Sequence, residues 1–256
     1  MKLGRREFLR AMLGAAGACL GGRILGPALA SGVPSVPVTG QARKRRWVML
    51  VDTAACDKGG CSDCIEACHR VHNVPALPDE KERIAWIRSL PYGQVLPDER
   101  APLVRDNLGR RSVLALCNHC ENPPCVPVCP TKATFRRDDG IVMMDYHRCI
   151  GCRYCMAACP FGARSFNWRD PRPFIKEINP GFPTRTQGVV EKCNFCEERI
   201  AKGQMPACVE ACTEKGLSFF DLNDPAPLNR NTLESRYFVV RRPALGTGPS
   251  VFYLVR

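Results

Sequence analysis

The stretch CIGCRYCMAACP, residues 149–160, has the most informative spacing in this sequence of 256 residues. Its four cysteines follow the pattern C-x2-C-x2-C-x3-C, and Pro160 follows directly. Three closely spaced thiolates can wrap one corner of a cubane iron–sulfur cluster, and the fourth lies about one helical turn further on. The spacing therefore predicts that three of these cysteines bind one cluster and the fourth binds a neighbouring cluster.

Three other groups of four cysteines also end in C-x3-C. The four groups are Cys56, Cys61, Cys64 and Cys68; Cys117, Cys120, Cys125 and Cys129; Cys149, Cys152, Cys155 and Cys159; and Cys193, Cys196, Cys208 and Cys212. Four matches along one chain indicate four [4Fe-4S] clusters. The first group departs from the pattern, because Cys56 and Cys61 enclose the longer turn DKGG. The alternative is that the first site is altered, incomplete or lost, which would leave three clusters.

Sequence around the cysteines predicts an α+β fold. The segments CPTKATF, CPFGARSF and CTEKGLSFF each place Ala or Gly four residues after the last cysteine of a group. Short apolar runs such as WVMLVD and SVLAL precede several groups. A strand, a cysteine turn, a short helix and another strand fit this repeat. We expect duplicated bacterial ferredoxin-like units with inserted loops, a helix over residues 80–89, and a C-terminal β-hairpin within residues 237–256.

Residues 1–30 predict a twin-arginine signal peptide, followed by a cluster-binding domain over residues 31–256. The motif RREFLR spans residues 5–10, with Gly4 where Ser or Thr is more usual, and Ala28-Leu29-Ala30 forms a cleavage site. One alternative is a retained anchor helix, although Arg23 shortens its apolar run. Another is lipidation at Cys19. Twin-arginine export moves folded proteins, so we expect a periplasmic protein whose cofactor is inserted before export.

Other uses of the cysteines fit the spacing less well. Zinc ribbons separate two cysteine pairs by a long loop and do not require a triplet followed by C-x3-C. Covalent haem needs C-x-x-C-H, which is absent, and a Rieske site needs two Cys/His pairs. The histidines are expected near clusters or on the surface, with His119 the best candidate for tuning a potential. They are His69, His72, His119 and His147.

The formal charge of +12 does not indicate a nucleic-acid partner. A cubane with four thiolates carries about −2, so several clusters would offset most of the basic charge. The sequence contains none of the motifs G-x-S-x-G, H-E-x-x-H or G-x-x-x-x-G-K. We therefore expect an electron-transfer protein without catalytic residues. The alternative is an enzyme that uses the irregular first group as an open redox or Lewis-acid site.

Residues 47–220 resemble the NrfC/HmcB-type polyferredoxins, which are electron-transfer subunits that dock on NrfD-like membrane proteins. The stretches CIEACHRVHNVP (64–75) and FPTRTQGVVEKCNFCEERIAKGQMPACVEAC (182–212) are similar to the DsrO family of DsrMKJOP complexes in dissimilatory sulfur metabolism, as is the tail ALGTGPSVFYL. This resemblance implies electron transfer between a periplasmic multihaem cytochrome c and a quinone-interacting NrfD-like membrane subunit. An equivalent subunit of a nitrite, polysulfide or molybdopterin oxidoreductase complex stays open.

The resemblance and the ferredoxin rule also imply that the groups exchange their fourth ligands in pairs. The expected ligands are Cys56, Cys61, Cys64 and Cys212 for cluster 1; Cys117, Cys120, Cys125 and Cys159 for cluster 2; Cys149, Cys152, Cys155 and Cys129 for cluster 3; and Cys193, Cys196, Cys208 and Cys68 for cluster 4. Exchange between the first and last groups would join the two ends of the cysteine-rich region.

Overall fold

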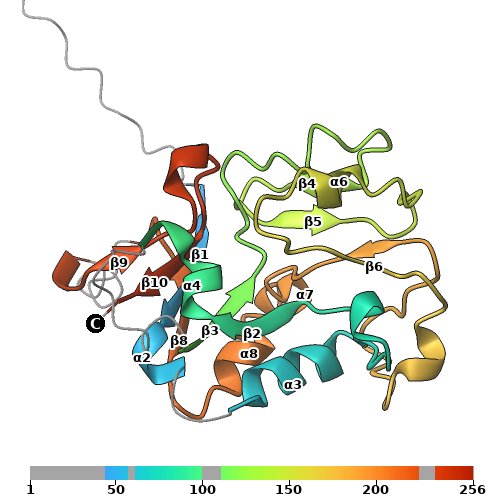
Figure 1. The fold of residues 1–256 in the computed structure, drawn as a ribbon, viewed down its shortest axis with the longest axis horizontal. Helices are drawn as coiled ribbons and strands as arrows, with labels where there is room; N and C mark the ends of the chain where they lie inside the picture. Colours follow the sequence, from blue (N-terminus) through green and yellow to red (C-terminus); the bar gives the residue numbers. More distant parts are fainter. Residues whose placement is uncertain (1–43, 57–60, 100–110, 225–233, 256) are drawn as a thin grey trace, which may run out of the picture. The chain divides into compact units, whose positions relative to one another are not determined.

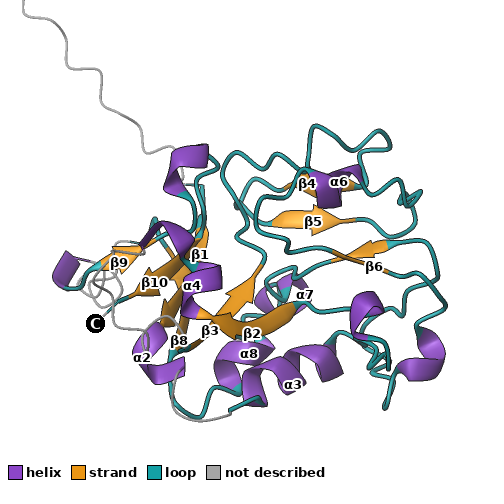
Figure 2. Ribbon diagram, viewed as in Figure 1, coloured by secondary structure: helices purple, strands orange, loops and turns teal. Residues whose placement is uncertain are grey.

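The computed structural model describes residues 44–56, 61–99, 111–224 and 234–255, which belong to one compact unit, Ala42–Arg256 (Figure 1). The expected signal peptide, Cys19 and the DKGG turn lie outside the described residues. Short helices and strands alternate with long connecting segments (Figure 2). Within the described residues, no helix has the length and apolar character needed to cross a bilayer.

A four-stranded sheet joins the two ends of the cysteine-rich region. Its order is β8-β1-β10-β9, formed by β1 (Trp47–Asp52), β8 (Leu217–Asp221), β9 (Phe238–Val239) and β10 (Val251–Leu254). Strand β1 pairs antiparallel with β8 and parallel with β10. Its residues Val48 to Val51 are all buried, as expected of a central strand that is covered on both faces.

The predicted C-terminal hairpin is present only in part. Strands β9 and β10 do pair antiparallel, through Val239 with Tyr253 and Phe238 with Leu254. Strand β10 pairs over a longer stretch with β1, and the 3-10 helix Pro243–Leu245 lies in the connection from β9. The C-terminal residues therefore complete a sheet with the N-terminal strand, and they do not form a separate two-stranded unit.

Three two-stranded antiparallel sheets lie between β1 and β8 in the sequence. They pair β2 (Ile87–Pro91) with β3 (Ser112–Leu116), β4 (Thr134–Arg136) with β5 (Val142–Met144), and β6 (Ser165–Phe166) with β7 (Val190–Glu191). These three pairs follow one another along the chain, and the β1–β8 pair encloses all of them in sequence. The β1–β8 pairing places the last cysteine group beside the first. Duplication into two equal units stays a prediction.

The helices are short, and all of those described except α4 contain or directly follow a cysteine of one of the groups. They are α2 (Thr53–Cys56), α3 (Asp63–Val71), α4 (Tyr92–Val95), α6 (Tyr154–Ala157), α7 (Glu197–Ile200) and α8 (Ala207–Glu210). Helices α3 and α8 pack side by side (Figure 1). The helix expected over residues 80–89 was wrong. Only Glu80–Glu82 forms a 3-10 turn, because pairing with β3 holds the following residues extended as β2.

Candidate cluster-binding sites

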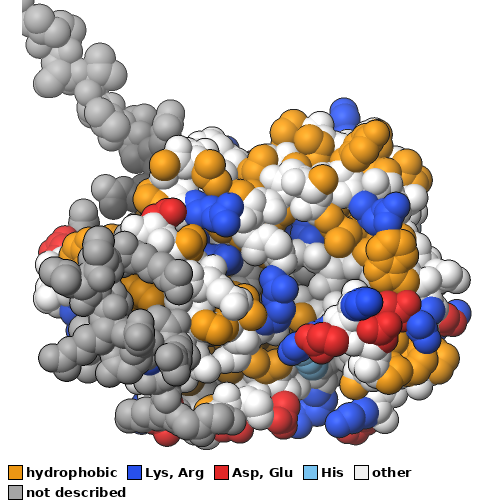
Figure 3. All heavy atoms as spheres, viewed as in Figure 1, with side chains coloured by type: hydrophobic (Ala, Val, Ile, Leu, Met, Phe, Trp, Pro, Cys, Tyr) orange, Lys and Arg blue, Asp and Glu red, His pale blue; other side chains and the backbone are white. Residues whose placement is uncertain are grey.

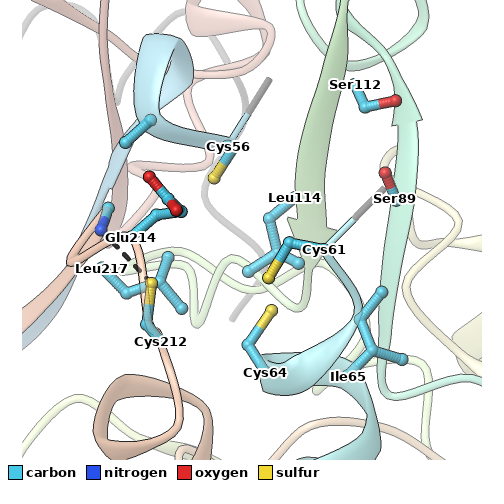
Figure 4. A pocket seen from close by; sticks show the side chains of 12 residues that line it. Cys56, Cys61, Cys64, Ile65, Ser89, Ser112, Leu114, Cys212, Glu214 and Leu217 are labelled. Carbon is cyan, nitrogen blue, oxygen red and sulfur yellow. Dashed lines mark hydrogen bonds between the residues drawn. The ribbon is translucent and has the colours of Figure 1, made fainter. Parts of the chain in front are cut away.

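The first cysteine set lines one cavity that is partly open to solvent, and its members are Cys56, Cys61, Cys64 and Cys212. Cys56 ends α2, Cys64 lies in α3, and Cys212 follows α8. Figure 4 shows the four sulfurs directed towards a common space between these elements. The β1–β8 pairing brings Cys212 to the first group, because Cys56 follows β1 and Cys212 precedes β8.

The second cysteine set lines another cavity, and its members are Cys117, Cys120, Cys125 and Cys159. Cys117 directly follows β3, whereas Cys159 comes from the turn after α6. The structure therefore places the fourth thiol of the third group beside the second group. Ligation of a cluster by these residues stays a prediction.

The other two sets are also assembled from different groups. Cys129, Cys149 and Cys155 pack in one apolar cluster, and the third set comprises these residues and the exposed Cys152. In the fourth set, burial raises the pKa of Cys68, and repulsion from Cys193, Cys208 and Cys196 raises it further. All four cysteines of the fourth set are buried.

Interactions between thiols of different sets give the order of the sets in space. Cys64 of the first set interacts with Cys68 and Cys208 of the fourth. Cys193 of the fourth interacts with Cys117 of the second. Cys125 of the second interacts with Cys155 of the third. These neighbouring thiols link the sets in the order first, fourth, second, third.

The donor chemistry fits iron–sulfur clusters. Burial raises the pKa of Cys56 to about 12, with repulsion from Cys64 adding to it, and raises that of Cys64 to about 11. Thiolates this close together are therefore unfavourable unless cations neutralise them. Iron in a cluster supplies that charge and binds the deprotonated sulfur. Four sulfurs per set provide the ligands that a [4Fe-4S] cluster requires.

Backbone turns that follow one plan hold the cysteines. In three C-x2-C turns the residue before the second cysteine has a positive φ: His119 (41°), Gly151 (69°) and Phe195 (60°). The third residue after the last cysteine also has a positive φ in Lys132 (56°), Gly162 (59°) and Lys215 (51°). The sequence repeat after these cysteines therefore corresponds to a repeated turn. In the first group Asp63 instead begins α3, so its turn differs.

Backbone amides approach the sulfurs, as the small residues near the turns predict. The amide of Gly216 donates to Cys212 Sγ at 3.2 Å, and that of Thr134 donates to Cys129 Sγ at 3.5 Å. A Cβ on Gly216 would lie 2.8 Å from Ala55 Cβ, so the close approach requires glycine. At Gly151 a Cβ would lie 2.3 Å from the carbonyl oxygen of Gly188. Such N–H···S bonds contribute to a cluster's reduction potential.

Two histidines lie beside the cysteine sets. Burial lowers the pKa of His119, whose ring stacks on Phe195 with centroids 3.7 Å apart and accepts a hydrogen bond from the Val142 amide. Its role in tuning a potential stays a prediction. Burial would lower the pKa of His72, but hydrogen bonds with Cys196 and Glu198 raise it to about 9. No sequence signal indicated this pairing, because Glu198 is remote from His72 along the chain.

His72, Cys196 and Glu198 form a second arrangement with ligand chemistry. Their ligand atoms lie within 4.8 Å of one another, and zinc uses all three donor types. Cys196 also belongs to the fourth cysteine set, so a metal here would compete with a cluster for the same sulfur. The other three thiols of the fourth set are also buried, and this favours binding of a cluster over binding of a single metal ion.

Buried charged residues near the sets were missed by sequence reasoning. Arg185 and Glu191 form a fully buried ion pair at 2.6 Å, and Glu191 also accepts a hydrogen bond from Trp86 Nε1 at 2.9 Å. Lys192 donates to the carbonyl oxygens of Val142 and Cys193. Glu191 and Lys192 lie between the apolar Val190 and Cys193. Charged residues within such an apolar run are a sequence signal that could have predicted their burial.

These features define a ferredoxin-like 4Fe-4S protein. The family model described as a 4Fe-4S dicluster domain matches residues 112–172 and 180–222, which contain the last three cysteine groups. The sequence is 43% identical over 278 residues to the Hdr-like menaquinol oxidoreductase iron-sulfur subunit 1 of Archaeoglobus fulgidus, covering 98% of this chain and 97% of that relative.

Two further relatives are similar over most of the chain. The menaquinone reductase iron-sulfur cluster-binding subunit of Nitratidesulfovibrio vulgaris is 35% identical, over 83% of this chain and 90% of the relative. The NrfC homolog of Haemophilus influenzae is 36% identical, over 83% of this chain and 81% of the relative. The chain therefore belongs to the NrfC-type family of 4Fe-4S electron-transfer subunits, which confirms the resemblance at the level of the family.

Proposed function

We propose that the protein is a non-catalytic electron-transfer subunit of a membrane quinone oxidoreductase complex, with four [4Fe-4S] clusters in a row. The exposure of the cysteines carries this proposal. Cys61 of the first set and Cys152 of the third are exposed, whereas the fourth set, inside the row, is wholly buried. The row thus reaches the surface at its two ends. Electrons can enter at one end, pass through the interior and leave at the other.

The end near Cys152 has the character of a docking surface. Large apolar side chains are exposed on this part of the described surface. They are Phe135 in β4, Ile150 in the cysteine turn before α6, and Tyr154 at the start of α6. Figure 3 shows hydrophobic side chains gathered over β4 and α6. Exposed apolar patches typically mark sites of protein or membrane contact. A partner docked here would reach the third set directly.

The proposed partners are an NrfD-like integral membrane subunit that interacts with quinone and a multihaem cytochrome c, with the protein in the periplasm after twin-arginine export. The stretches similar to the DsrO family support a role in dissimilatory sulfur metabolism. The names of two relatives, which refer to menaquinol and menaquinone, support the link to quinone. A relative named NrfC homolog keeps another host complex as the alternative.

Purification of the tagged protein from its native membranes under anaerobic conditions tests this function. We expect an NrfD-like membrane subunit and a multihaem cytochrome to copurify. We also expect a quinol analogue to reduce the clusters, which is measured as a loss of visible absorbance. Copurification of a molybdopterin subunit would replace the sulfur-metabolism proposal. Clusters that remain oxidised with the quinol analogue in the intact complex would contradict the quinone link.

A further inference from the structure

Arg164 lies between the second and third cysteine sets. Its side chain is buried, and it lines the cavity of the second set. Burial raises the pKa of Cys125 in the second set and of Cys155 in the third set, and the nearby positive charge of Arg164 opposes this effect at both thiols. Its Nη1 donates to Thr134 Oγ1 at 3.2 Å. One cation therefore lies at the junction of the two sets, close to thiols of both.

No carboxylate balances this cation within the described residues. The other fully buried guanidinium discussed above, Arg185, has Glu191 at 2.6 Å. An unpaired buried charge is costly, so Arg164 requires a negative partner in the mature protein. The sulfur ligands close to it supply that charge, because a cubane with four thiolates carries about −2 when oxidised.

A fixed positive charge at this position favours reduction of nearby clusters. Reduction adds one negative charge to a cluster, and the interaction is strong where water is excluded. An arginine does not lose its proton in a protein, so the effect does not depend on pH. The same side chain lies close to thiols of two sets, so it acts on both clusters together.

We propose that Arg164 raises the reduction potentials of the clusters held by the second and third sets, so that electrons in the row reside preferentially at the end near Cys152. This inference rests on the proposed function. It assigns Arg164 a positioning and electrostatic role, and it makes the third set the end from which electrons leave, or at which they wait for a partner.

Redox titration of the anaerobically purified full chain, monitored by electron paramagnetic resonance, tests this role. The variants are Arg164→Met and Arg164→Gln, which remove the charge, and Arg164→Lys, which retains it. Arg172→Met is the control, because Arg172 is exposed and paired with Asp170. We expect the neutral variants to lower two of the potentials by at least a tenfold change in the reduction equilibrium, which is 59 mV for a one-electron couple.

Arg164→Lys is expected to stay close to the wild-type potentials, and the control is expected to match them. The proposal is overturned if neutral variants with full iron content keep all potentials unchanged, or if Arg164→Lys shifts as far as Arg164→Met. If neither neutral variant retains its clusters, Thr134→Val carries the test by removing the hydroxyl that holds Nη1. Altered potentials for the same two clusters would support the role, and unaltered potentials would overturn it.

The two ideas fail in distinguishable ways. Wild-type protein without reducible clusters would contradict the proposed function itself. Wild-type protein with four reducible clusters whose potentials ignore the charge at position 164 would leave that function standing and remove only the role of Arg164.

Discussion

Replacing Cys212 by serine should damage the cluster of the first set while sparing that of the fourth. The Cys212 sulfur shares its cavity with Cys56, Cys61 and Cys64 and accepts a hydrogen bond from the Gly216 amide at 3.2 Å. Cys212→Ser removes one of four sulfur ligands and that N–H···S bond. We expect the iron content to fall from about sixteen atoms to between about twelve and fifteen, because only one cubane of four is affected.

The assay combines iron and sulfide analysis with electron paramagnetic resonance of the anaerobically purified protein. Cys208→Ser is the matched control, since Cys208 lies in the same C-x3-C segment but belongs to the fourth set. The two variants should each lose a different cluster signal. The reasoning is refuted if both variants remove the same signal, because Cys212 would then bind with its own group.

Two further perturbations follow from the structure and one from the sequence. Gly216→Ala should reduce stability by about 1–3 kcal/mol, since its Cβ would lie 2.8 Å from Ala55 Cβ; adding Ala55→Gly should restore the thermal midpoint, and no recovery would argue against this clash. Glu191→Gln leaves the Arg185 charge unbalanced and should lower the free energy of unfolding by about 3–5 kcal/mol. The measurement is the rate at which visible absorbance is lost in guanidinium, which should rise in this variant and change little in the exposed control Glu177→Gln. Equal rates in the two variants would show the ion pair to be unimportant. Replacing Arg5 and Arg6 by Lys should retain the precursor in the cytoplasm with clusters inserted, as judged by cell fractionation, and normal export would rule out the twin-arginine route.

The family resemblance and the ferredoxin rule implied which groups exchange their fourth cysteines, and ligation by these sets stays a prediction. The structure places Cys212 beside the first group and Cys159 beside the second, as the spacing and the family rule predicted. The turns could also be anticipated from the repeat, since Gly162 occupies a left-handed position that favours glycine.

Long-range pairing could not be predicted in the same way. The helix expected over residues 80–89 was wrong because β2 pairs with β3, which lies beyond a long connection in the sequence. The parallel pairing of β10 with β1 is likewise non-local, so the C-terminal strands were interpreted as a simple hairpin. The order of the four sets in space depends on these pairings and was not available from spacing alone.

The buried charged residues were also not predicted from the sequence. Arg164, Arg185 and Lys192 resemble surface residues in a basic sequence, and charged side chains are rarely buried without a partner. Their partners are a distant carboxylate, backbone oxygens and cysteine sulfurs, none of which sequence periodicity reveals. Contacts of this kind depend on long-range pairings such as β1–β8, which place cysteine groups from different parts of the chain next to one another.

The central claim is a row of four clusters with ligands exchanged between groups. Anomalous diffraction at the iron edge from crystals of the anaerobically purified protein tests it most directly. The account predicts four cubanes in the order first, fourth, second, third, with Cys212 Sγ bound to the same cubane as Cys56, Cys61 and Cys64. Only three cubanes, or Cys212 Sγ on the cubane bound by Cys193, would contradict it.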